Sequence, residues 1–139
     1  LRHRRCILPA SSFIEWTEAA GHKQPWLIRP EHGAIAFAGL WDVWEKEGNY
    51  LESCTIITTG AAPGIDRLHN RMPVMLRERD FARWLDVEKP LGDPSDILHS
   101  RLPHPFVLAP VSPAVNNSRH KSEALLATVG EEERIDAVD

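Results

Sequence analysis

The sequence predicts a single α+β domain that consists mainly of antiparallel β-strands, with a few short helices at its edges. In the first half of the chain, β-branched and aromatic residues recur in short runs separated by Gly, Pro and Asn. Helical spacing of apolar residues occurs only later and over short stretches. The 139 residues are 42% hydrophobic and 26% charged, which is typical of one globular domain spanning 1–139.

Short strands account for most of the first half of the chain. Polar loops that each contain a glycine separate them, as short antiparallel connections often require. We place these loops at 21–23, 30–33 and 45–49, and we therefore predict a meander of hairpins. The expected strands cover 5–8, 13–18, 25–29, 35–43 and 50–59.

Helices are expected only in the second half. Phe81, Trp84 and Leu85 have the spacing of one helical face and predict an amphipathic helix at 80–85. Asp93 followed by Pro94 is typical of an N-cap and a first helical residue, which predicts a second short helix. The remaining expected elements are strands at 73–76 and 106–111, a short helix at 123–128 and a flexible acidic tail at 130–139.

Several classes of protein are disfavoured. No apolar run approaches the roughly 20 residues of a membrane helix, and no signal peptide is recognisable, so a cytoplasmic protein is expected. The two cysteines, Cys6 and Cys54, lie far apart without a CxxC spacing, which argues against a zinc site or a disulfide framework. The first residues resemble the middle of a folded domain, and we therefore expect that an N-terminal part is missing.

The net charge of −4 gives no overall attraction to nucleic acid, but the charge is unevenly distributed. Basic residues cluster at 2–5 and acidic residues at 131–133. Two interpretations of the other basic residues remain open: they line one face, or they are scattered solvated charges. These residues are Arg67, Arg71, Arg77 and Arg79, together with the group at 119–121.

The segment 58–73 is the first candidate site. A turn interrupts an apolar strand there, and His69 and Arg71 follow two residues apart, which places them on one face of an extended backbone. Histidine exchanges protons near neutral pH, and the planar guanidinium of arginine binds phosphate or carboxylate. The alternatives are a histidine bonded to the backbone and an Arg71 salt bridge to Asp66 or Asp42.

Glu15 is the second candidate catalytic residue. Period-two alternation places Phe13 and Glu15 on one face of a strand, and Ile14 and Trp16 on the other. Among large apolar neighbours, a carboxyl group loses solvation, which raises its pKa toward a range useful for proton transfer. The alternative is a glutamate at a strand edge in solvent.

Other candidate sites are weaker. Trp41 and Trp44 are able to stack on bases, but tryptophans more often fill cores, and we expect these two to do so. Ser112 is isolated, and no nucleophile-elbow motif is present to support a serine triad. Phosphate-binding loops, dinucleotide fingerprints and zinc-protease motifs are absent, so we predict no cofactor and no metal.

Six motifs together resemble the SRAP family, the SOS response-associated peptidases, in the family's order and over nearly the whole chain. They are RRCILPASSFIEW at 4–16, KQP at 23–25, FAGLWD at 37–42, TIITT at 55–59, HNRMPV at 69–74 and VSPAVN at 111–116. The resemblance implies an α+β fold around a curved, barrel-like antiparallel sheet. It also implies a monomer that binds single-stranded DNA in the DNA damage response and is associated with the nucleoid when bound.

The resemblance further implies a covalent reaction with abasic sites. In the family, a cysteine exposed at the N-terminus forms a Schiff base with the opened sugar through its α-amine, and its thiol then closes a thiazolidine. Carried over by motif, Glu15 moves protons at that amine and His69 assists opening of the sugar. Arg71 holds a DNA phosphate, and Thr58 hydrogen-bonds DNA or the catalytic groups.

The chain departs from the family pattern in three places. Ser12 replaces a glycine, and Asn70 replaces an aspartate. The family's Cys-Gly-Arg start and its Asn-Ala-Arg region are not in these residues, and Cys6 is internal and lacks a free α-amine. We therefore expect residues 1–139 alone to be inactive in cross-linking. Two alternative functions remain: a cysteine-type peptidase acting in autoprocessing, and a noncatalytic DNA-binding or structural fragment.

Overall fold

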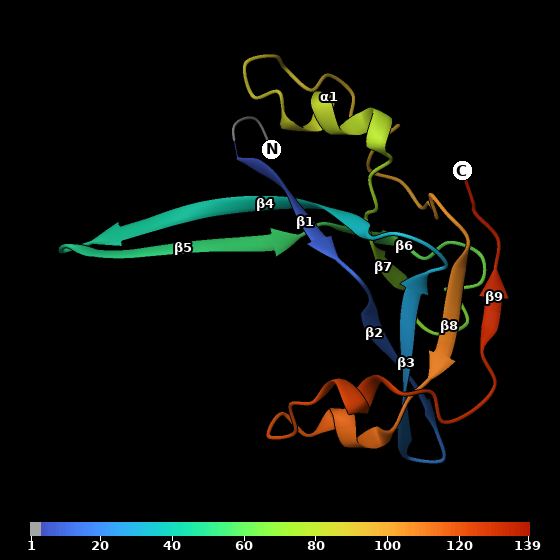
Figure 1. Cartoon of the computed structure of the whole chain (residues 1–139). Helices are drawn as coiled ribbons and strands as arrows, with labels where there is room; N and C mark the ends of the chain where they lie inside the picture. The colour runs from blue at the N-terminus through green and yellow to red at the C-terminus, as the bar shows by residue number, and fades with distance from the viewer. Residues whose placement is uncertain (1–3) are drawn as a thin grey trace.

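The computed structural model describes residues 4–139, which form antiparallel sheets with a few short helices (Figure 1). The predicted α+β class and the antiparallel pairing are confirmed. The strands are β1 (Arg5–Ala10), β2 (Phe13–Ala19), β3 (His22–Pro30), β4 (Ile35–Lys46), β5 (Asn49–Ile56), β6 (Thr58–Gly60), β7 (Arg71–Pro73), β8 (Phe106–Pro110) and β9 (Glu133–Ile135). The helices are η1 (Glu78–Asp80), α1 (Phe81–Leu85), η2 (Pro113–Asn116) and η3 (Glu123–Leu126).

The described strands form three sheets, and these sheets are not closed into a barrel. Their orders are β1-β4-β5, β2-β3-β8-β9 and β6-β7. Within residues 4–139, β5 is paired only on the side that faces β4, and its outer edge has no strand beside it. A sheet with an open edge is not a closed barrel.

The strand connectivity also differs from the predicted meander. The hairpins β2–β3 and β4–β5 are present, and each turns through a residue with positive φ followed by a glycine. In contrast, the loop after Pro30 joins two sheets rather than two paired strands. There β4 leaves β3 and pairs with β1, while β3 pairs with β8.

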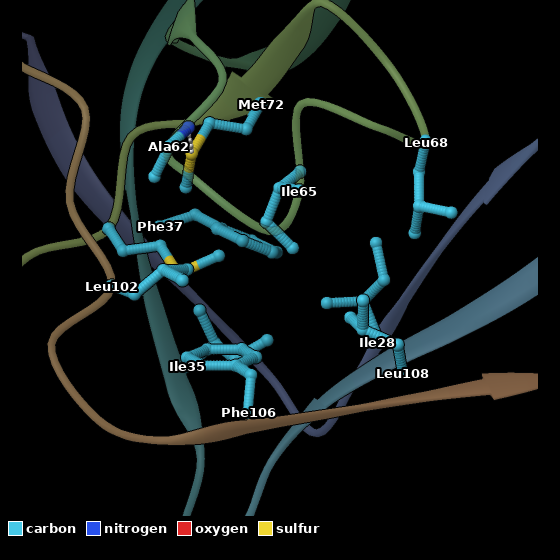
Figure 2. Close-up of a cluster of buried hydrophobic side chains, with 11 residues drawn as sticks. Ile28, Ile35, Phe37, Ala62, Ile65, Leu68, Met72, Leu102, Phe106 and Leu108 are labelled. Carbon is cyan, nitrogen blue, oxygen red and sulfur yellow. Dashed lines mark hydrogen bonds between the residues drawn. The ribbon is translucent and has the colours of Figure 1, made fainter. Parts of the chain in front are cut away.

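The main core lies where the sheets meet, and Figure 2 shows its side chains converging from both halves of the chain. Buried residues of β3, β4 and β8 contact residues of the loop that connects β6 to β7. The fully buried members include Ile28, Ile65, Met72, Leu102 and Leu108. Burial of apolar side chains from such distant segments fixes the loop to the sheets.

The outer half of β4 and its partner β5 extend away from this core (Figure 1). Trp41 is 39% exposed and Trp44 is 53% exposed, so the expectation that they fill a core is wrong. Almost every residue in this part of the β4–β5 hairpin is exposed, Tyr50 and Leu51 among them.

The helices are shorter than expected. In α1, Trp84 is fully buried and its Nε1 donates to the Cys6 carbonyl at 2.8 Å, whereas Leu85 is exposed. The predicted helix after Pro94 is only one turn, in which Ile97 and Leu98 both donate to the Pro94 carbonyl. The expected helix near 123–128 is the 3₁₀-helix η3.

The acidic C-terminal segment does not fray as predicted. Strand β9 pairs with β8, and Ile135 packs against the main core. Beyond β9, Leu102 and Val138 exchange two backbone hydrogen bonds of 2.8 and 2.9 Å. Ile135 supplies apolar contact, and the pairing of Glu132 with Arg29 and of Glu133 with Arg67 reduces repulsion among the neighbouring glutamates.

Two absences concern the described residues alone. No helix in residues 4–139 is both long and apolar enough to cross a membrane. The same residues contain no group of three or more His, Cys, Asp or Glu placed to hold a metal ion.

Candidate functional site

The short pair β6–β7 brings Thr58 and Arg71 together. In its register Thr58 is opposite Pro73, and Gly60 is opposite Arg71. One guanidinium nitrogen of Arg71, Nη2, donates to the Thr58 carbonyl at 2.9 Å and to the Thr58 hydroxyl at 3.0 Å. Both residues are exposed, so the rest of the guanidinium faces solvent.

The salt-bridge alternatives for Arg71 are not seen among the described residues. Asp42 pairs with Arg4 on the extended part of β4, and the Asp66 carboxylate accepts the Gly64 N–H at 3.1 Å. Both carboxylates are therefore engaged elsewhere. Arg71 is held by neutral oxygens of Thr58, and its positive charge remains available to an anion.

His69 is fixed by the backbone of its own loop. Its ring Nδ1 accepts a hydrogen bond from the backbone N–H of Arg71 at 3.1 Å, and the backbone N–H of His69 donates to the Ile65 carbonyl at 3.2 Å. Ile65 and Leu68 are buried in the main core, while the His69 side chain is exposed. The core thus anchors the loop, and the imidazole faces outward.

The contacts of His69 also bear on where its proton lies. A ring nitrogen that accepts a hydrogen bond carries no proton. The neutral tautomer that fits this geometry therefore has its proton on Nε2. Nδ1 is also 3.0 Å from the Arg71 carbonyl, to which a protonated Nδ1 would donate. The Arg71 backbone therefore offers Nδ1 both a donor and an acceptor.

Glu15 lies on β2, and its side chain is partly buried. Burial raises the pKa of the Glu15 carboxyl, and the nearby charge of His69 and a backbone hydrogen bond from Trp16 partly offset that rise. The fold therefore brings Glu15 and His69 within electrostatic reach, although 54 positions separate them in the sequence. No direct hydrogen bond joins them among the described residues.

The sequence reasoning missed Trp26, which lies beside Glu15, and Arg67, which lies over Trp26. Trp26 is directly opposite Glu15 in the β2–β3 register, so both side chains are on one face of the sheet. The guanidinium of Arg67 lies 5.3 Å from the centre of the Trp26 ring. In the sequence, Arg67 is only one of several basic residues, and no sequence signal places Trp26 beside Glu15.

A hydrogen bond also ties β2 to η2. Trp16, next to Glu15 but on the other face, donates through Nε1 to the side-chain oxygen of Asn116 at 2.6 Å. Asn116 is the last residue of the motif at 111–116. This contact explains how a motif distant in sequence helps to fix the strand that carries Glu15.

The basic residues do not all gather at this site. Arg67 and Arg71 are near His69 along the chain, whereas Arg77 and Arg79 line a different cavity together with Arg101. Of the two interpretations left open by the sequence, a single basic face that includes Arg67, Arg71, Arg77 and Arg79 is therefore not supported.

Comparison with known proteins adds a family. The family model described as SOS response associated peptidase (SRAP) matches residues 1–118. The abasic site processing protein YoqW of Bacillus subtilis is 37% identical over 131 residues, covering 88% of this chain and 57% of that protein. The abasic site processing protein HMCES of Rattus norvegicus is 31% identical over 156 residues, covering 89% of this chain and 43% of that protein. The chain thus spans about half the length of these relatives.

Solved structures show the same fold. A protein from Bacteroides thetaiotaomicron superposes with a TM-score of 0.81 at 21% identity, covering 92% of this chain and 58% of that one. A protein from Bordetella bronchiseptica gives a TM-score of 0.66 at 30% identity, covering 78% and 55% of the two chains. Because the family model matches well over half of its residues, this chain belongs to the SOS response associated peptidase family.

Proposed function

We propose that this domain acts in the DNA damage response by binding single-stranded DNA and processing abasic sites. The observation that carries the proposal is the approach of Glu15 to His69, beside an arginine held ready for an anion. The relatives YoqW and HMCES are abasic site processing proteins by name, which supports the same substrate here.

Arg71 is proposed to bind a DNA phosphate. Its Nη2 is committed to Thr58, and this double contact orients the planar group without neutralising it. Oriented guanidinium groups bind phosphate oxygens through charge-assisted hydrogen bonds. Thr58 then acts as a positioning residue, a narrower role than direct contact with DNA.

Glu15 and His69 are proposed to move protons during capture of the opened sugar. An amine adds to the C1′ aldehyde carbon, the resulting hydroxyl leaves as water after taking a proton, and a thiol adds to the imine carbon while its proton moves to nitrogen. The raised pKa of Glu15 favours a carboxyl group that both donates and accepts protons. The exposed imidazole of His69 is a suitable second proton carrier.

The nucleophile of this reaction is proposed to be an N-terminal cysteine of the family's type. Neither cysteine of the chain fits that role. Cys6 is within β1, where burial first and Cys54 second raise the pKa of its thiol, and Cys54 is on the exposed strand β5. Residues 1–139 are therefore proposed to supply binding and proton transfer but not the covalent bond.

The direct test mixes the protein with single-stranded DNA that carries one abasic site and separates the products on a denaturing gel. A form that begins with the family's Cys-Gly-Arg should give a protein–DNA band that survives denaturation, and residues 1–139 alone should bind reversibly. Absence of the band from the Cys-initiated form, despite measurable DNA binding, would leave a noncatalytic DNA-binding function. A band from residues 1–139 alone would show that the nucleophile has been misassigned.

A further inference from the structure

The indole of Trp26 is held in a fixed orientation next to Glu15. The two residues are opposite each other in the β2–β3 register, and Cβ atoms of such pairs are about 4.5–5.5 Å apart. The indole Nε1 of Trp26 donates to the Thr17 hydroxyl at 3.1 Å. Thr17 is two residues after Glu15 and therefore on the same face of β2. The hydrogen bond thus directs the indole along the strand that carries Glu15.

Arg67 covers the ring of Trp26. Its guanidinium carbon lies 5.3 Å from the centre of the ring, a distance typical of a cation–π contact. The same guanidinium is paired with Glu133 on β9. An aromatic ring and a carboxylate together hold Arg67, so its positive charge is committed to partners other than Glu15.

The charged groups around Glu15 come mainly from one loop. His69 and Arg67 belong to the loop between β6 and β7, and Glu133 belongs to β9. On the same face of β3, the titratable residue is His22, at the hairpin end of the strand. The loop thus brings a histidine and an arginine to the region of Glu15.

The two loop side chains act differently on Glu15. Burial is the largest cause that raises the pKa of the Glu15 carboxyl, and the charge of His69 lowers it. Arg67 instead lies against Trp26 and pairs with Glu133. A cation that is offset by a carboxylate exerts a weaker field on a third group. Glu15 thus keeps a raised pKa although an arginine is anchored to the residue opposite it.

We propose that Trp26 is a positioning residue of the candidate site, whose ring covers Glu15 from one side and separates its carboxyl from the guanidinium of Arg67. The N–H of the ring is bound to Thr17, so the ring excludes water from the carboxyl without donating to it. Lost solvation favours the protonated carboxyl. In its bearing on proton transfer to a sugar this inference rests on the proposed function, whereas the protonation of Glu15 itself does not.

A tryptophan that only fills space would affect stability and leave the protonation of Glu15 alone. Trp26 does pack against the main core, so a loss of stability is expected in either case. The test therefore follows the carboxyl group of Glu15 directly.

The test records the Glu15 carboxyl carbon by carbon-13 NMR during a pH titration, with the resonance assigned through Glu15→Gln. Trp26→Val keeps a β-branched residue in the strand but removes the ring, so the titration midpoint of Glu15 should shift to lower pH. Trp26→Phe keeps an apolar ring and should retain most of the parent midpoint. An unchanged midpoint in Trp26→Val would overturn the proposal.

Trp16→Val is the matched control. Trp16 is next to Glu15 in sequence but on the other face of β2, and the substitution removes its hydrogen bond to Asn116. The Glu15 midpoint should stay where it is in the parent chain. A shift as large as that in Trp26→Val would mean that a loosened strand is the cause, and it would overturn the role of Trp26.

Arg67 provides a variant that leaves the strands intact. With the ring in place, Arg67→Gln should hardly move the Glu15 midpoint, whereas in the Trp26→Val background it should move the midpoint back up. His69→Gln removes the charge that lowers the pKa of Glu15, so it should raise the midpoint and show that the titration senses a nearby cation. A rise in Arg67→Gln as large as that in His69→Gln would contradict the separating role of Trp26.

The pH dependence of cross-linking distinguishes this inference from the proposed function. In the Cys-initiated form, the part of the pH–rate profile that follows Glu15 should shift with the NMR midpoint in Trp26→Val. A shifted midpoint in a form that does not cross-link would support the role of Trp26 and contradict the proposed function instead. A shifted pH–rate profile with a fixed Glu15 midpoint would overturn the inference.

Discussion

Arg71 is held to Thr58 by one nitrogen that donates to two oxygens, the carbonyl at 2.9 Å and the hydroxyl at 3.0 Å. This contact crosses the two strands of the smallest sheet, β6–β7. It fixes the direction of a flexible, exposed side chain and leaves its charge uncompensated. The affinity for single-stranded DNA should depend on both residues, but to different degrees.

Replacing Arg71 tests the phosphate contact. Arg71→Gln should weaken binding of single-stranded DNA about tenfold and reduce the salt dependence of log K by about one phosphate contact, near 0.7 per decade of salt. Fluorescence anisotropy at several salt concentrations measures both quantities. An unchanged salt slope would show that Arg71 does not contact a phosphate.

Replacing Thr58 tests the positioning role. Thr58→Val removes the hydroxyl acceptor but keeps the carbonyl, so DNA affinity should fall only about twofold to fivefold, with an unchanged salt slope. Thr55→Val, on the exposed strand β5, is the matched control and should bind as the parent chain does. A reduced salt slope in Thr58→Val would indicate an effect on charge rather than on orientation.

The raised pKa of Glu15 predicts a pH-dependent stability. Its folded-state pKa exceeds the unfolded value because of burial, so the folded state retains the proton as pH rises through that window and stability falls there. Glu15→Gln should raise the thermal midpoint about 1–3 °C at pH 7, and the gain should shrink toward pH 4.

The control for this experiment is on the same strand. Glu18 is exposed on β2, and Glu18→Gln should change the midpoint little at either pH. Equal gains for Glu15→Gln at pH 4 and pH 7 would mean that lost solvation of the ionised carboxylate is not the cause.

Gly39 is required where β4 passes between β1 and β5. A Cβ at this position would overlap Cδ1 of Leu8 and would lie 3.0 Å from the Cys6 sulfur and 3.1 Å from the Thr55 carbonyl. Gly39→Ala should therefore destabilise the fold by about 1–3 kcal/mol in urea unfolding. Gly21→Asn, at an open hairpin position with φ of +76°, should cost clearly less. Equal costs would argue against the tight packing at Gly39.

The strand β9 should stabilise the loop that carries His69. Ile135 is against Gly64, where an added Cβ would be 3.1 Å from two Ile135 carbons, and Glu133 pairs with Arg67. Ile135→Ala should lower stability by about 1–3 kcal/mol and speed hydrogen exchange of the His69 amide. Val129→Ala, at an exposed position, is the control. Unchanged exchange at His69 would separate β9 from the site.

The sequence predicted where individual strands lie better than which strands pair with each other. Val, Ile, Thr and aromatic residues between glycine turns located the hairpins at Gly21 and Gly48, because these signals are local. The pairing of β1 with β4 and of β3 with β8 depends on contacts between distant segments. A turn at Gly33 has the same local chemistry whether it joins two paired strands or two sheets.

The candidate site was likewise predictable only in part. Glu15, His69, Arg71 and Thr58 were proposed from residue type and family motifs, and the fold brings Glu15 to His69 and Thr58 to Arg71. Trp26 beside Glu15 was not predictable, since cross-strand register depends on the exact pairing of β2 with β3.

Exposure was also hard to predict from residue type. Trp41 and Trp44 are large and apolar, but they lie on the outer half of β4, where both are exposed. Arg101 is charged, yet it is buried by the chain segment that returns with Val138. In both cases, the neighbours that decide burial are remote in sequence.

The central claim is that Glu15 and His69 together move protons at an abasic sugar. Free L-cysteine supplies an α-amine and a thiol, so its thiazolidine formation with abasic single-stranded DNA reports proton transfer without an N-terminal cysteine. Residues 1–139 should accelerate that reaction at pH 7 about tenfold to a hundredfold over DNA alone, and Glu15→Gln or His69→Gln should abolish most of the gain, unlike Glu18→Gln. A rate equal to that of DNA alone, or an undiminished rate in both variants, would contradict the claim.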